Sequence, residues 1–462
     1  MPKNISASKA ELGQFFTRNS ALQDLAVSLL TTRSGRVLEP SAGAGHLVAA
    51  LERWRPHVTV TALDLAPSAD KVCDGDIDAE DFFSFVTRTN TRFEAVLTNP
   101  PFVALNRVSG ETLMAAGDLT SRYGKQANLY YLFLDRCLDL LVDGGEMVAI
   151  VPKEWLYTTS AAPLRAKLHA QGALTHLVDC GEEKLFPDAD VPALVLFRFV
   201  KGADAAQPFA FWSSFGSATK REAPESRTLV SAGSGWLLLS DSSAEVIRGW
   251  GLLGNVVKAR VGTLTGLDAA FVLSKDHHIE PSMVRQLVGT KKTAVSYLDA
   301  EHIHSAADLP PAARAHLDPH RRALESRGAA DPKAWWKYTA ARNATAMSST
   351  TPRIFALAKS RSLDPFFACE GTHHGAGVLG LYLVEDCLFS AAEILEVLNS
   401  ATYREVLVCM GLTTGNKLTL QPSTLHAAPF PRTRDQLSAV LGHAPAAEIR
   451  YSGLEVVSAL AA

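Results

Sequence analysis

The sequence predicts an α/β protein whose first 200 residues form a Rossmann-like, doubly wound and mostly parallel β-sheet. Two observations carry this prediction. Short apolar runs rich in β-branched residues alternate with segments of helical periodicity, and a Gly-rich turn follows the first of these runs. Strands that are apolar throughout are typical of a parallel sheet with helices on both faces. Beyond residue 200 the alternation is less regular, which favours a separate domain of mixed α/β structure.

The expected elements can be placed in chain order. Strands are predicted at Val37–Leu38, Val58–Leu63, Ala95–Thr98, Gly145–Val151, Leu174–Asp179 and Leu194–Val200. The last strand should run antiparallel to the others, and the stripe of apolar residues at Tyr130–Leu141 predicts a helix. Residues 201–235 are rich in Ala, Ser, Gly and Glu, which favours a linker or an edge hairpin. We therefore expect one domain at residues 1–200 and another at residues 236–462.

Composition excludes several classes of protein. With 47% apolar and 20% charged residues over 462 positions, the chain can bury real cores and is not disordered. Its six cysteines show no paired spacing, which argues against a disulfide framework or a zinc site and predicts no bound metal. No apolar run reaches the roughly 18 residues of a membrane span, and the first residues lack the apolar segment of a secretory signal. The expectation is a cytoplasmic protein with no membrane contact.

Charge is distributed unevenly along the chain. The formal net charge is only −3, yet residues 1–200 carry 19 basic and 24 acidic side chains. Residues 248–361 carry 17 basic and 9 acidic side chains, a net charge of +8. This stretch mixes cations with aromatic rings, as nucleic-acid surfaces do. Its candidate contacts are Lys291, Lys292, Arg321, Arg322, Trp335, Trp336 and Lys337. The alternative is a solvated basic face with the two tryptophans in a core.

The Gly-rich turn predicts a cofactor site. It reads Glu39-Pro40-Ser41-Ala42-Gly43-Ala44-Gly45, and the next strand ends at Asp64. Glycines one residue apart allow a tight turn and a close approach to a ligand, and an acid about 20 residues on can accept hydrogen bonds from ribose hydroxyls. This pattern alone leaves NAD, FAD and S-adenosyl-L-methionine open. The missing third glycine disfavours a dinucleotide, and the carboxylate of Glu39 favours a cationic cofactor.

A second motif follows the third predicted strand. The residues Asn99-Pro100-Pro101-Phe102, downstream of the Gly-rich turn, resemble the hallmark of amino-group methyltransferases. In such a site the Asn99 side-chain oxygen and the Pro100 carbonyl accept hydrogen bonds from an exocyclic amine. This draws the amine nitrogen towards sp³ geometry and frees its lone pair. The two prolines hold the acceptors in place, and Phe102 can stack on a planar base.

Further motifs resemble those of the gamma class of DNA adenine-N6 methyltransferases, which includes the Taq-type and Xam-type modification enzymes. Gly13–Thr17 resembles the first cofactor motif of this class, and the resemblance implies that Thr17 lies near the methionine part of the cofactor. Asp81-Phe82 resembles its acid-aromatic pair, in which Asp accepts from the cofactor's adenine amine and Phe packs on the ring; Asp74 and Asp76 compete for the acid role. Phe186 resembles the aromatic residue that stacks on the flipped base, although a core role is the alternative.

The resemblance implies the fold, the substrate and the cofactor contacts. The sheet would be the seven-stranded sheet of class I methyltransferases, and residues 236–462 would form a target-recognition domain for double-stranded DNA. Adenine would be flipped from the duplex and methylated at N6, and a cognate restriction endonuclease is an expected partner. The implied cofactor residues are Thr17, Glu39, Ser41, Ala42, Gly43, Gly45, Asp64, Asp81, Phe82 and Asn99. An RNA adenine methyltransferase, a protein glutamine-N5 methyltransferase and a cytosine-N4 target remain as alternatives.

Overall fold

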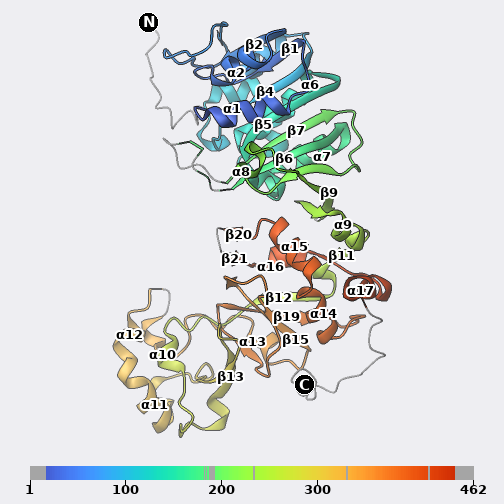
Figure 1. The fold of residues 1–462 in the computed structure, drawn as a ribbon. Coiled ribbons are helices and arrows are strands. Elements are labelled where there is room, and N and C mark those ends of the chain that lie inside the picture. The colour runs from blue at the N-terminus through green and yellow to red at the C-terminus, as the bar shows by residue number, and fades with distance from the viewer. Residues whose placement is uncertain are drawn as a thin grey trace, which may run out of the picture. The chain divides into compact units, whose positions relative to one another are not determined.

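The computed structural model describes residues 17–181, 183, 185–186, 193–232, 235–328, 331–414 and 417–442. The chain divides into two compact units, residues 1–244 and residues 245–462 (Figure 1). The first unit therefore extends beyond residue 200, where the first domain was expected to end. Each unit has its own sheets and its own buried core.

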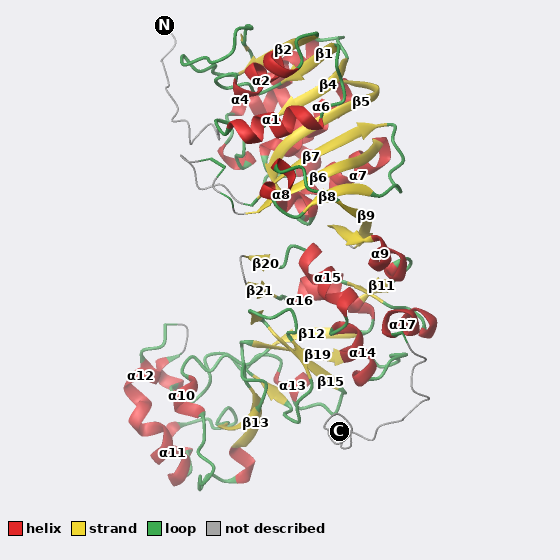
Figure 2. Cartoon of the chain, in the orientation of Figure 1, coloured by secondary structure: helices red, strands yellow, loops and turns green. Residues whose placement is uncertain are grey.

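A mixed ten-stranded sheet organises the first unit. The strands lie in the order β10-β9-β8-β6-β7-β5-β4-β1-β2-β3 (Figure 2). Their bounds are β1 Gly35–Glu39, β2 Val58–Asp64, β3 Asp78–Ala79, β4 Phe93–Thr98, β5 Leu141–Pro152, β6 Gly172–Gly181, β7 Leu194–Lys201, β8 Phe209–Trp212, β9 Glu225–Ala232 and β10 Gly235–Ser240. Strands β1 to β5 are mutually parallel, and β7 runs antiparallel to both β5 and β6.

This arrangement confirms the predicted parallel sheet with an antiparallel strand at residues 194–200. All six predicted strands lie within observed ones. The sheet has ten strands, however, where seven were expected. The extra strands come from residues 209–240, most of which were expected to form a linker or an edge hairpin. There β8 pairs with β6, and β9 and β10 pair with each other as an antiparallel hairpin at the edge of the sheet.

Helices cover both faces of this sheet, as a doubly wound fold requires. One face carries α1, α2 and α8, whose apolar residues share a core with Val37, Leu97 and Ile150. The other face carries α3 to α7, which pack against Leu38, Val96 and Ala149. The helices span α1 Ser20–Leu29, α2 His46–Trp54, α3 Phe82–Arg88, α4 Gly110–Ala116, α5 Leu119–Tyr123, α6 Leu129–Leu140, α7 Ala162–Gln171, α8 Phe215–Thr219 and α9 Asp241–Ile247. The predicted helix at 130–141 is α6.

The second unit is built from small sheets. Its largest is antiparallel, in the order β12-β19-β15-β17, and two three-stranded sheets have the orders β14-β13-β18 and β16-β21-β20. Strands β11 and β22 form a further pair. The bounds are β11 Gly251–Leu252, β12 Val257–Val261, β13 Val284–Val288, β14 Ala294–Leu298, β15 Arg353–Leu357, β16 Lys359–Ser360, β17 Phe366–Phe367, β18 His373–His374, β19 Val378–Leu383, β20 Thr413–Thr414, β21 Lys417–Thr419 and β22 Pro429–Phe430.

The helices of the second unit are short. They span α10 Asp268–Phe271, α11 Pro311–Leu317, α12 Arg321–Glu325, α13 Ala344–Met347, α14 Ala391–Leu398, α15 Ala401–Cys409, α16 Pro422–Ala427 and α17 Arg434–Leu441. Helices α10, α11 and α12 enclose a core that contains Phe271 and both Trp335 and Trp336. Arg327 stabilises this region, because its guanidinium donates to the backbone carbonyls of Trp335 and Lys337, both at 2.9 Å.

Candidate functional site

The Gly-rich turn lies between β1 and α2 and is bound to the end of β2. Ala42 N donates to Leu63 O at 2.8 Å, and Gly43 N donates to Asp64 Oδ2 at 2.7 Å. Gly45 caps α2 with a φ of 84°, in the left-handed region that favours glycine. A Cβ atom at Gly45 would lie only 2.4 Å from the Cys73 sulfur. The turn therefore needs glycine at this position for two separate reasons.

Glu39 ends β1 as a fully buried acid. Its Oε1 accepts hydrogen bonds from Ser41 N and from Thr98 Oγ1, both at 3.1 Å. Its Oε2 is buried and has no hydrogen-bond partner among the residues that the structure describes. Burial, with a smaller contribution from nearby Asp64, raises the pKa of Glu39 to about 8 against the lowering effect of the Ser41 and Thr98 hydrogen bonds. A buried acid with an unused oxygen fits a cationic group.

Asp64 lies at the end of β2, next to the turn. Its two oxygens accept from the backbone nitrogens of Gly43 and Ala66, at 2.7 and 2.8 Å. The carboxylate therefore holds the Gly-rich turn, and its predicted bond to a ribose stays a prediction. Leu65 follows directly and is 55% exposed. Leu65 is not among the predicted site residues, and its place as an apolar residue directly after the acid at a strand end is the signal that makes it a candidate.

The Asn-Pro-Pro-Phe motif follows β4, which lies beside β1 in the sheet. Ser41 Oγ donates to the Asn99 backbone carbonyl at 3.2 Å, and Asn99 Nδ2 donates to Thr17 Oγ1 at 3.1 Å. Pro100 is buried and Pro101 is half-buried. The Phe102 ring packs edge-on against Tyr130, with ring centroids 5.8 Å apart. The structure thus brings the two predicted motifs together at the carboxyl edge of the parallel strands.

The structure places Asp81 and Phe82 at the start of α3. Asp81 Oδ1 accepts from Ser84 N at 2.9 Å and caps the helix, which leaves Oδ2 as its other acceptor. Phe82 is buried and stacks on Phe133, with ring centroids 4.9 Å apart. Phe82 is thus a core residue, because α3 places its ring between the sheet and α6. Packing of this ring on a cofactor stays a prediction.

Phe186 is also buried, in the core that α1 and α2 form with the sheet. The Phe102 ring packs against the same core. Stacking of Phe186 on a flipped base stays a prediction, and core packing was its stated alternative. Residues Gly13 to Phe16, which carried the resemblance to the first cofactor motif, lie outside the described residues.

The candidate nucleic-acid residues fall into two groups. Lys291, Lys292, Arg321 and Arg322 are exposed, and Lys337 is half-buried. Trp335 and Trp336, in contrast, are each only 4% exposed. Both rings fill the core beneath α10 to α12, as the stated alternative expected, and their contact with nucleic acid stays a prediction. Arg321 lies over the Trp335 ring at 5.1 Å and pairs with Glu325 at 2.8 Å.

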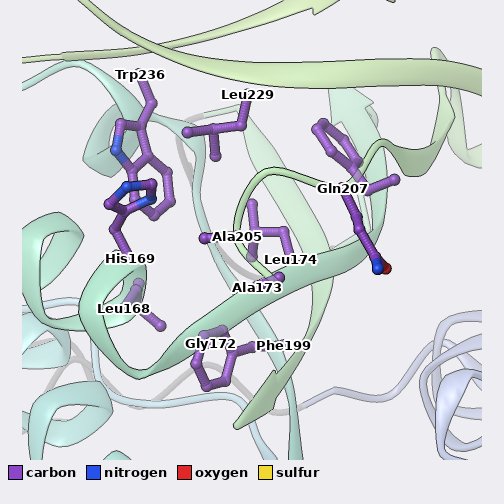
Figure 3. Close-up of a pocket in the computed structure, with 11 residues that line it drawn as sticks. Leu168, His169, Gly172, Ala173, Leu174, Phe199, Ala205, Gln207, Leu229 and Trp236 are labelled. Carbon is purple, nitrogen blue, oxygen red and sulfur yellow. The ribbon is translucent and has the colours of Figure 1, made fainter. Parts of the chain in front are cut away.

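A small apolar pocket lies elsewhere in the first unit. Figure 3 shows it at the amino end of β6, lined by residues such as Leu168, Leu174, Phe199 and Trp236. The amino ends of the parallel strands form the edge of the sheet opposite to the Gly-rich turn. The residues that line the pocket include none of the predicted site residues. The pocket is therefore not the predicted site.

In the part of the chain that the structure describes, no three His, Cys, Asp or Glu side chains gather closely enough to hold a metal ion. No helix within the same described ranges combines the length and the apolar character that crossing a bilayer requires.

Part of the chain matches a known protein family, and most of it resembles known enzymes in sequence. Residues 59–186 match the model of a family described as Eco57I restriction-modification methylase. The type II methyltransferase M.HincII of Haemophilus influenzae is 25% identical over 201 residues, which are 42% of this chain but only 38% of that enzyme. The type II methyltransferase M.TthHB8I of Thermus thermophilus is 26% identical over 364 residues, which cover 71% of this chain and 78% of that one.

A solved structure shows a looser likeness. The type IIL restriction-modification enzyme MmeI, in complex with DNA, superimposes with a TM-score of 0.48 at 10% identity, over 88% of this chain and 64% of that one. The match to M.TthHB8I covers more residues than either compact unit contains, so it includes parts of both. The chain is therefore similar to type II restriction-modification methyltransferases, and its residues 59–186 match the Eco57I restriction-modification methylase family.

Proposed function

We propose that this chain is a site-specific DNA methyltransferase that transfers a methyl group from S-adenosyl-L-methionine to N6 of adenine. One observation carries the proposal. Ser41 joins the two motifs, because its backbone nitrogen donates to the buried carboxyl group of Glu39 and its hydroxyl donates to the Asn99 backbone carbonyl. An acid suited to a cation thus lies close to the residue whose side-chain amide would accept from an amine. The similarity to type II methyltransferases supports DNA as the substrate and a restriction endonuclease as the partner.

The residues at the end of β1 and β2 fit S-adenosyl-L-methionine. When bound, this cofactor supplies a methyl group on a positively charged sulfur. The buried Oε2 of Glu39 would pair with a cationic group of its methionine part. Asp64 would accept from the ribose hydroxyls, and the exposed side chain of Leu65 offers an apolar surface for the adenine ring. The Oδ2 atom of Asp81 would accept from the adenine amine.

Cofactor binding should depend on pH through Glu39. Its pKa of about 8 means that the acid is protonated in the free protein below pH 8, and a bound cation favours the ionised form. The affinity should therefore rise by about tenfold per pH unit as the pH increases towards 8 and level off above it. Calorimetric titration with S-adenosyl-L-methionine between pH 6 and 8.5 measures this. In Glu39→Gln the affinity should be low and nearly flat, and an unchanged pH profile in that variant would contradict the assignment.

The residues after β4 would activate the target amine. Asn99 Oδ1 and the Pro100 carbonyl would accept from the exocyclic NH2, which frees the nitrogen lone pair for attack. Ser41 fixes the Asn99 backbone through its hydrogen bond at 3.2 Å. The Phe102 ring, itself held edge-on by Tyr130, would stack on the extruded base. Positioning and hydrogen bonding are thus the main contributions of the chain, and no covalent bond to the protein is required.

The second unit would supply the affinity for the DNA backbone. Residues 1–200 have a net charge of −5, whereas residues 248–361 have a net charge of +8. Lysine and arginine side chains bind phosphates and release condensed counterions. Lys291 and Arg322 are exposed members of this basic stretch and are available for such contacts.

Removing both cations should weaken the salt dependence of DNA binding. In the double variant Lys291→Ala/Arg322→Ala, we expect the slope of log K against log salt to become less negative by about 2, because each phosphate contact contributes about 0.9. Fluorescence anisotropy with a labelled duplex at several salt concentrations measures the slope. Lys220→Ala, which removes an exposed lysine of the first unit, is the control. An unchanged slope in the double variant would place the DNA contacts elsewhere.

A transfer assay tests the proposed function. The full chain is incubated with methyl-labelled S-adenosyl-L-methionine and with unmethylated duplex DNA, RNA or protein. Label in DNA, recovered as N6-methyladenine after digestion, supports the proposal. Recovery of N4-methylcytosine would overturn the adenine assignment. Label in RNA alone, or in protein glutamine alone, would overturn DNA as the substrate.

A further inference from the structure

The side chain of Asn99 is held in one orientation by a residue far away in the sequence. Its Nδ2 donates to Thr17 Oγ1 at 3.1 Å, while its backbone carbonyl accepts from Ser41 Oγ at 3.2 Å. The first contact fixes the side chain and the second fixes the backbone. Since the nitrogen and the oxygen lie on opposite arms of an amide, a nitrogen bound to Thr17 directs Oδ1 away from Thr17.

Thr17 is itself held firmly in place. Its side chain is 4% exposed, and its backbone carbonyl accepts from Gln23 Nε2 at 2.7 Å. Gln23 is buried in the first turn of α1, where its own backbone nitrogen donates to Asn19 O at 3.1 Å. The acceptor for the Asn99 amide is thus anchored to a helix that packs on the sheet.

The orientation of this amide decides whether the site can accept an amine. With Oδ1 facing the base, the amide accepts a hydrogen bond from the exocyclic NH2. With Nδ2 facing the base, two donors would oppose each other. The two orientations have nearly the same shape, so sterics alone cannot select between them. A neighbour whose hydroxyl oxygen accepts from Nδ2 on the far side stabilises the first orientation.

We propose that Thr17 is a positioning residue that orients the Asn99 amide so that its oxygen faces the target amine. This inference rests on the proposed function and goes beyond the cofactor contact that the resemblance implied for Thr17. Gln23 supports the arrangement by holding the Thr17 backbone. The hydroxyl of Thr17, and not its methyl group, is the group that matters.

Steady-state kinetics of Thr17→Val and Thr17→Ser in the full chain test this proposal. Thr17→Val keeps the shape of the side chain but removes the acceptor, so kcat should fall by about 10- to 100-fold, the range of one lost hydrogen bond to a polar group. The KM values for cofactor and DNA should stay within about twofold. Thr17→Ser keeps the hydroxyl and should restore kcat to within about threefold of the original chain.

Two results would overturn the proposal: an unchanged kcat in Thr17→Val or an equally low kcat in Thr17→Ser. A raised KM for cofactor together with an unchanged kcat in Thr17→Val would show a cofactor contact instead. Absence of any methyl transfer in the original chain would be a failure of the proposed function and not of the positioning role.

Gln23→Leu provides a second variant if Thr17→Val does not fold. Loss of its hydrogen bond to the Thr17 carbonyl should lower kcat with little change in cofactor KM. The matched control is Asn19→Ala, which removes the cap of the same helix, where Asn19 Oδ1 accepts from Leu22 N at 3.1 Å. That control should lower the thermal midpoint without lowering kcat. An equal loss of kcat in both variants would show a merely structural effect and overturn the proposal.

Discussion

Asn99→Ala should lower the rate constant of methyl transfer by about 10²- to 10³-fold, the cost of removing one hydrogen-bonding group aimed at a reacting centre. The side chain is the acceptor that would draw the amine nitrogen out of conjugation with the ring, and alanine offers none. Single-turnover transfer of labelled methyl to duplex DNA measures the effect. The affinity for S-adenosyl-L-methionine should change little, because Glu39 and Asp64 remain in place.

A matched control separates chemistry from folding. Asn90→Ala makes the same substitution at an exposed position just before β4, and it should leave the rate unchanged. Asn99→Ala should also keep the thermal midpoint close to that of the original chain, since Asn99 is only half-buried. If Asn99→Ala retained full activity, the proposed activation of the amine would be disproved.

Asp135→Ala should be the most destabilising of the substitutions considered in this protein, at about 3–5 kcal/mol. Asp135 is fully buried in α6, and its carboxylate accepts from the Tyr123 hydroxyl and from Lys167 Nζ, both at 2.7 Å. Alanine would leave Lys167 without one of its partners and the buried hydroxyl of Tyr123 without its acceptor. Lys167 also pairs with Asp139 at 2.7 Å, which favours the lower end of the range.

Urea unfolding followed by tryptophan fluorescence measures this loss. The control is Asp118→Ala, which removes a 61% exposed acid that pairs with Arg122 and Arg136 on the surface. Exposed pairs contribute little, so the control should lower the free energy of unfolding by no more than about 1 kcal/mol. Equal losses in the two variants would contradict the special role of the buried carboxylate.

The sequence predicted the strands of the sheet centre because their apolar runs are continuous. The strands at the two edges of the sheet were not predicted, for a physical reason. Strand β3 has only two residues, both exposed, and β9 mixes polar and apolar residues over 225–232. Such edge strands are stabilised by backbone pairing with a neighbour far away in the sequence, which local composition does not reveal.

The candidate site was predicted unevenly. The Gly-rich turn and the Asn-Pro-Pro-Phe motif are each a continuous stretch of sequence. They lie close together because each follows a parallel strand, and these strands end at the same edge of the sheet. The contact between Thr17 and Asn99 spans 82 positions and depends on how α1 packs. The burial of Trp335 and Trp336 could not be predicted, because a cluster of aromatic and basic residues looks the same in sequence whether its rings face outwards or fill a core.

The close approach of Gly45 to Cys73 restricts which sequences this cofactor turn can tolerate. The sulfur occupies the space where a side chain at position 45 would begin, and the φ of 84° independently disfavours any residue other than glycine. Shortening residue 73 would remove the steric conflict but not the backbone strain. A library that diversifies this turn should therefore keep position 45 constant and vary position 73 only among small side chains, because the two positions behave as one unit of design.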